Sequence, residues 1–113
     1  MGIYMNIKVK EYIDSLKGKK VAFVGMGVAN VPCAKWLASK GIDVYACDKR
    51  DKEFIGMEDC LEMEKLGIHF SLGDNYLAIL PDMDIVFRSH GIQGVCFQYL
   101  LQQQYQAYEP YFP

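Results

Sequence analysis

The residues with the clearest capacity for binding chemistry form one glycine-rich segment. Its predicted binding residues are Gly25, Gly27, Val28, Ala29 and Asn30. An apolar run precedes the segment and a helical pattern follows it, so the segment is predicted to join a strand to a helix. Two glycines let an anion approach main-chain amides, and a helix start offers unpaired N–H groups and a partial positive charge. We therefore predict a phosphate-binding turn, although such turns also use glycine for steric reasons alone.

A second group of candidates follows the next predicted strand. Asp48, Lys49 and Arg50 come directly after its apolar residues, and Asp48 lies 18 residues after Asn30. In dinucleotide-binding folds an acidic residue here contacts a ribose or base, and neighbouring cations suit a diphosphate. A run of mixed charges is also typical of a solvated loop. The predicted place of this run, at the end of a parallel strand beside the glycine turn, favours ligand binding.

Ser89 and Gly91 follow the last predicted strand and form the third candidate group. No catalytic residue accompanies them. His69 lies within a predicted strand, which indicates a structural role, and His90 has no nucleophile or paired carboxylate beside it in the sequence. The four cysteines are widely and unevenly spaced, which argues against a metal site or a disulfide framework.

Alternating strand and helix patterns must position these three groups. The predicted helices cover residues 6–16, 28–40 and 58–66, with a short helix or turn at 75–80. The predicted strands cover residues 21–25, 42–47, 68–72 and 84–88. Such alternation requires right-handed crossovers and a parallel sheet. We predict an α/β, Rossmann-like three-layer domain with a parallel sheet of four to five strands.

Composition and charge describe an ordinary globular domain. The chain has 113 residues, 51% of them hydrophobic and 23% charged, and a formal net charge of -2. The charges form no basic stripe, so we expect no nucleic-acid partner. No apolar stretch approaches the length of a transmembrane helix and the first residues lack a signal-peptide pattern, so we expect no membrane partner and a cytoplasmic location.

The composition changes near residue 89. All six glutamines and four of the eight tyrosines lie beyond that point, together with a single acidic or basic residue, Glu109. We therefore divide the chain into a domain at residues 1–92 and an atypical Gln- and Tyr-rich tail at residues 93–113. The tail is expected to be partly disordered or to form a homodimer contact. A frameshift or truncation near codons 89–94 is our hypothesis for the switch.

Together the three groups resemble the amino-terminal domain of the Mur ligases, and most of all the family members that add D-glutamate. The resemblance covers about residues 17–92, and its motifs are the glycine turn with Pro32, Cys47-Asp48-Lys49-Arg50, and Arg88-Ser89-His90-Gly91-Ile92. It implies a domain that binds UDP-N-acetylmuramoyl-L-alanine in peptidoglycan synthesis, and so in cell-wall biogenesis and cell division. In that family the glycine turn faces the diphosphate, and the residues matching Asp48, Lys49 and Arg50 meet the uracil and ribose.

By the same resemblance, Ser89 with Gly91 closes the pocket, and His90 replaces a proline that the family usually has between them. The family's central domain carries a G-x-x-G-K-[ST] phosphate loop, which has no match in this sequence. We therefore expect no cofactor on this chain, with ATP and magnesium bound only by the full-length family enzyme, and no ligation by the chain alone. Two alternatives remain open: an NAD-binding domain of an oxidoreductase, and a non-catalytic dimerising remnant.

Overall fold

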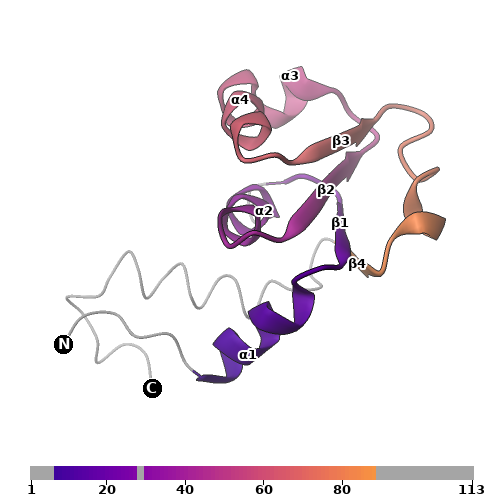
Figure 1. Cartoon of the computed structure of the whole chain (residues 1–113). Helices are drawn as coiled ribbons and strands as arrows, with labels where there is room; N and C mark the ends of the chain where they lie inside the picture. The colour runs from indigo at the N-terminus through magenta and orange to yellow at the C-terminus, as the bar shows by residue number, and fades with distance from the viewer. Residues whose placement is uncertain (1–6, 28–29, 89–113) are drawn as a thin grey trace.

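The fold was analysed in a computed structural model, which describes residues 7–27 and 30–88 (Figure 1). Helices and strands alternate along this part of the chain, as the apolar patterns predict. In chain order the elements are α1 (Ile7–Leu16), β1 (Lys20–Val24), α2 (Asn30–Ser39), β2 (Asp43–Asp48), α3 (Lys52–Ile55), α4 (Met57–Lys65), β3 (His69–Leu72), the 3-10 helix η1 (Leu80–Asp82) and β4 (Ile85–Phe87). Apart from α3 and η1, the boundaries agree with the predicted ones to within two residues wherever the predicted ends are described; the short helix or turn predicted at residues 75–80 is a turn that leads into η1.

The four strands form one parallel sheet in the order β3-β2-β1-β4. Two successive crossovers, through α2 and then through α3 and α4, move the chain in one direction across the sheet. Right-handed crossovers place these helices on one face, and the return from β3 to β4 passes over the other face. Figure 1 shows this division, with α2, α3 and α4 on one side and η1 on the other. The predicted α/β, Rossmann-like fold with a parallel sheet is therefore confirmed.

The core lies between the sheet and the helices that cover it. Val21 and Phe23 of β1 are fully buried, and their partners in register on β2 are Val44 and Ala46. Because side chains on neighbouring parallel strands point to the same face when their residues pair, these four line the face that α2 covers. Leu37 of α2 is also fully buried, and burying a leucine contributes roughly 1.5–3 kcal/mol. Burial of the side chains on the central strands therefore stabilises the sheet that positions the site.

A four-residue helix, α3, is present where the sequence analysis predicted neither helix nor strand. Asp51 begins it, because its Oδ1 accepts a hydrogen bond from the backbone N–H of Phe54 at 3.1 Å. Gly56 ends it with a φ of 114°, which separates α3 from α4. One helical turn is too short to show an apolar period, so its end signals are the clue that a sequence offers.

Within residues 7–27 and 30–88, no helix has both the length and the apolar character needed to cross a bilayer. The tail at residues 93–113 lies outside the described residues, and so do its predicted disorder and dimer contact. These two expectations stay predictions.

Candidate functional site

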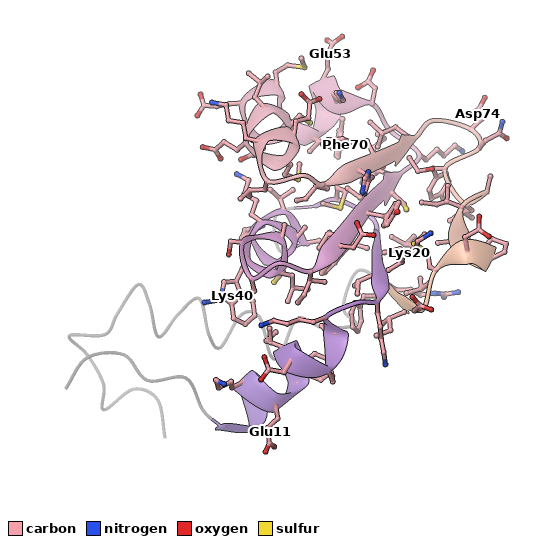
Figure 2. The ribbon with its side chains drawn as sticks, in the orientation of Figure 1. Glu11, Lys20, Lys40, Glu53, Phe70 and Asp74 are labelled. Atoms are coloured by element: carbon pink, nitrogen blue, oxygen red, sulfur yellow. The ribbon has the colours of Figure 1, made fainter. Side chains whose placement is uncertain are left out.

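The candidate site lies where the carboxyl ends of β1, β2 and β4 meet. In Figure 2, Asp74 lies just beyond β3, at the carboxyl ends of the strands. Lys40 lies just beyond α2 and before β2, at the amino ends of the strands. β1 lies between β2 and β4, and the chain leaves it toward β2 on one face and returns to β4 from the other. Ligands of open α/β sheets bind at such a switch point, outside the carboxyl ends of the strands.

Gly25 makes the sharp bend that ends β1. Its φ is 94°, a backbone conformation that residues other than glycine rarely adopt. Its N–H donates to the carbonyl oxygen of Cys47 at 2.8 Å, and its own carbonyl accepts from Asn30 Nδ2 at 2.6 Å. Both bonds satisfy the backbone at the bend and tie it to β2 and to α2. The first glycine of the turn is therefore required by backbone geometry.

Gly27 lies where α2 begins and leaves space beside the backbone. The N–H of Val31 donates to the carbonyl oxygen of Gly27 at 3.1 Å, so helical hydrogen bonding begins at this residue, as predicted. A Cβ built on Gly27 meets no heavy atom within 4 Å among the described residues. The predicted ligand residues Val28 and Ala29 lie outside those residues. What is described is an open backbone at the start of a ten-residue helix.

Asn30 is buried at the first position of α2. Its amide nitrogen holds the Gly25 carbonyl, and its Oδ1 is buried without a hydrogen-bond partner among the described residues. A buried oxygen left unpaired costs roughly 1–3 kcal/mol. Asn30 therefore shapes the turn through its nitrogen and keeps an acceptor at the helix start through its oxygen.

Asp48 joins the end of β2 to the glycine turn. Its side chain is 2% exposed. Oδ2 accepts from the backbone N–H of Met26 at 2.7 Å, and Oδ1 accepts from the backbone N–H of Arg50 at 2.8 Å and from Arg50 Nε at 3.0 Å. The carboxylate therefore lies on the same rim as the turn, and donors from the chain bind both of its oxygens.

These donors set the charge state of Asp48. Burial alone raises the pKa of its carboxyl group, but hydrogen bonds from the side chain and backbone of Arg50 and from the Met26 N–H outweigh burial and lower the pKa below its usual value. The carboxylate in turn raises the pKa of the Arg50 guanidinium. At neutral pH the pair is a carboxylate and a guanidinium with no net charge, and the guanidinium is the half-exposed partner while the carboxylate is buried.

Arg50 and Phe54 form a stack that the sequence patterns did not single out. The Arg50 Cζ lies 3.6 Å from the centroid of the Phe54 ring, while Nε and Nη2 bond to Asp48. Lys49 is exposed between Asp48 and Arg50. Arg50 precedes Asp51, the N-cap of α3, so the two side chains do not share a helix and no helical spacing in the sequence indicated their contact.

The third predicted group follows β4. Phe87, the last residue of β4, pairs with Phe23 of β1, so the chain after β4 begins at the same rim as the turn. Ser89 and Gly91 themselves lie outside the described residues, and their role in closing the pocket stays a prediction.

The thiols near the site are predicted to be unreactive toward alkylating reagents. Cys47 and Cys60 are buried free thiols; burial raises the pKa of Cys47 to about 11 and also raises that of Cys60. Because the thiolate is the reactive form, we expect neither residue to be alkylated at pH 8 in the folded protein and both to react in denaturant. Peptide mapping by mass spectrometry after iodoacetamide treatment measures this. Labelling of native Cys47 at the rate of the unfolded chain would contradict it.

Comparison with curated proteins finds sequences similar to this chain. No family model matches this chain, and no solved structure does. The UDP-N-acetylmuramoylalanine--D-glutamate ligase of Ruminiclostridium cellulolyticum is 38% identical over 89 residues, which are 79% of this chain and 19% of that ligase. The ligase of the same name from Clostridium acetobutylicum is 38% identical over 79 residues, 70% of this chain and 17% of the ligase. That from Clostridium botulinum is 40% identical over 85 residues, 75% and 18% respectively.

The chain thus spans less than a fifth of the length of these curated relatives. These relatives are named as the D-glutamate-adding ligases, the family members that the motifs at Gly25 to Asn30, Cys47 to Arg50 and Arg88 to Ile92 resemble most. The resemblance predicted from those motifs is therefore confirmed.

Proposed function

We infer that this chain, a relative of part of the UDP-N-acetylmuramoylalanine--D-glutamate ligases, is a domain that binds the uridine diphosphate portion of UDP-N-acetylmuramoylalanine. Its relatives support a place in peptidoglycan synthesis. The finer proposal, a binding role for this chain itself, depends on the rim of the sheet. We place that role in the cytoplasm, where nucleotide-linked precursors are made.

The observation that carries the proposal is the open backbone at Gly27 on the rim that also holds Asp48 and Arg50. A helix start favours an anion through its unpaired N–H groups and the helix dipole. A Cβ built on Gly27 meets no described heavy atom within 4 Å, so the space beside this backbone is open to a ligand. The main-chain amides at the start of α2 are therefore the proposed diphosphate site.

Arg50 adds the charge that a nucleotide diphosphate requires. Its side chain is half-exposed, although two of its nitrogens are bound to Asp48. We propose that Asp48 holds both the glycine turn and Arg50 in place. We propose that Arg50 and Lys49 face the nucleoside. The Asp48 carboxylate already accepts four hydrogen bonds, one from the Met26 N–H and three from Arg50, which is about all that a carboxylate accepts, so we propose that it serves the ligand through Arg50.

We expect binding without ligation from this chain. Amide-bond formation by such ligases uses ATP to activate a carboxylate, and no phosphate-loop motif for ATP occurs in the sequence. Glutamate addition is therefore assigned to a protein of the relatives' full length, in which ATP and magnesium would bind outside the part that this chain matches.

Isothermal titration calorimetry of the purified chain tests the proposal. UDP and UDP-N-acetylmuramoyl-L-alanine should each bind with one site per chain, and NADH should give no saturable heat. Binding of the UDP compounds should weaken with rising salt, because exposed charges attract the diphosphate. Absence of binding at millimolar UDP, or tighter binding of NADH than of UDP, would overturn the proposal.

A further inference from the structure

Phe54 is an exposed aromatic side chain on the candidate rim. It is 54% exposed in α3, and among its described contacts is the guanidinium of Arg50. Its backbone N–H bonds to Asp51 Oδ1, so the start of α3 depends on the backbone of this residue and not on its ring. The ring is therefore not needed for the helix cap, and its exposure leaves it available for a role at the site.

The Phe54 ring and the Asp48 carboxylate hold the Arg50 guanidinium on two sides. Asp48 binds two nitrogens along one edge of the guanidinium, and the ring lies 3.6 Å from the guanidinium carbon. The Arg50 side chain is nevertheless half-exposed. Among the described residues, these contacts engage one edge and one face of the guanidinium, so the opposite face and Nη1 are the parts left for a ligand. A guanidinium held in this way is a flat, charged surface of fixed orientation.

We propose that Phe54 is a positioning residue for nucleotide binding, which holds the Arg50 guanidinium so that its exposed face stacks on the planar base. This inference rests on the proposed function and extends it to a residue outside the glycine, aspartate and arginine motif. A guanidinium stacks on flat π-systems, and fixing it before the ligand arrives removes the cost of ordering it on binding. The inference separates two parts of the ligand. The base requires the stack, and the diphosphate requires the backbone amides of the turn.

The separation can be measured with two probes, UDP and inorganic pyrophosphate. Phe54→Leu keeps an apolar side chain and the backbone cap but removes the ring. We expect it to weaken UDP binding by roughly 3- to 10-fold and to leave pyrophosphate binding unchanged. Phe54→Tyr keeps the ring and should bind UDP as the wild type does. Leu61→Ala is the matched control, because Leu61 is 56% exposed on the neighbouring α4 and should alter neither affinity.

A double-mutant cycle tests whether Phe54 acts through Arg50. Arg50→Ala should weaken UDP binding, and adding Phe54→Leu to it should cause no further loss, because the group that the ring positions is already gone. Equal UDP affinity in Phe54→Leu and the wild type would overturn the inference alone. Equal weakening of UDP and pyrophosphate, or independent effects in the cycle, would also overturn it. A wild-type chain that binds neither probe would overturn the proposed function together with this inference.

Discussion

Replacing Asp48 with alanine is expected to lower the free energy of unfolding by about 2–4 kcal/mol. The substitution removes the acceptor of the buried Met26 N–H. It also removes the acceptors of the Arg50 backbone N–H and of the Arg50 guanidinium. A buried N–H without an acceptor is costly because it loses water on folding and gains nothing in return. Urea unfolding followed by circular dichroism measures the change. Asp74→Ala, at an exposed position just beyond β3, should stay within about 0.5 kcal/mol of the wild type.

The Asp48 carboxylate also makes the free energy of unfolding depend on pH in a predictable direction. The pKa of Asp48 is lower in the folded protein than in the unfolded chain, where an aspartate titrates near about 3.9. Its charged form therefore stabilises the fold fully above that unfolded value, and this contribution is lost as the pH falls through the folded pKa. The stability gap between wild type and Asp48→Asn should be constant at neutral pH and narrow in acid. A gap that widened on acidification, or an alanine variant as stable as the wild type, would show that Asp48 does not hold the turn.

Replacing Gly27 with valine is expected to weaken UDP binding by at least about tenfold, since a branched side chain would fill the space that a phosphate oxygen needs. The fold should tolerate the change, because Gly27 is not among the glycines with positive φ and a Cβ there meets no described atom within 4 Å. Calorimetry with UDP and thermal unfolding measure the two effects separately. Unchanged UDP affinity in Gly27→Val would contradict the proposed position of the diphosphate.

Gly25→Ala is the matched control for this valine variant. Gly25 has a φ of 94°, so a methyl group there strains the backbone by roughly 1–2 kcal/mol. We expect Gly25→Ala to reduce stability and Gly27→Val to reduce binding, although both change a glycine of one motif. A loss of stability in Gly27→Val equal to that in Gly25→Ala would show that the two glycines share a steric role.

Much of this fold was predictable because its elements carry strong local patterns. β1 contains a continuous apolar run from Val21 to Val24 that ends at a glycine, and α2 places its small and apolar residues on one face. α3 was not predictable from periodicity, since four residues make one turn and its start depends on the Asp51 side chain. The strand order was also open, because alternation and handedness permit more than one arrangement of four strands.

The candidate site was predictable in its place but not in its internal contacts. The sequence predicts that Asp48 follows β2 on the rim of the glycine turn, and the structure places it there. It does not predict that donors from Met26 and Arg50 occupy both oxygens, because these bonds depend on how two strand ends meet in space. The Phe54 ring was missed for a similar reason. Its contact with Arg50 forms only once α3 has turned the chain back toward the rim.

The strand order has a consequence for synthesis on the ribosome. β4 lies beside β1, and Lys20 and Asp84, which are joined by a hydrogen bond at the start of the two strands, are 64 residues apart in the chain. At about 5–20 residues per second, translation takes roughly 3–13 seconds to cover that interval. During that time the apolar flank of β1 at Val21 to Phe23 has no neighbour on one side. Until Phe87 has been synthesised, this edge of β1 lacks the strand that covers it in the folded domain.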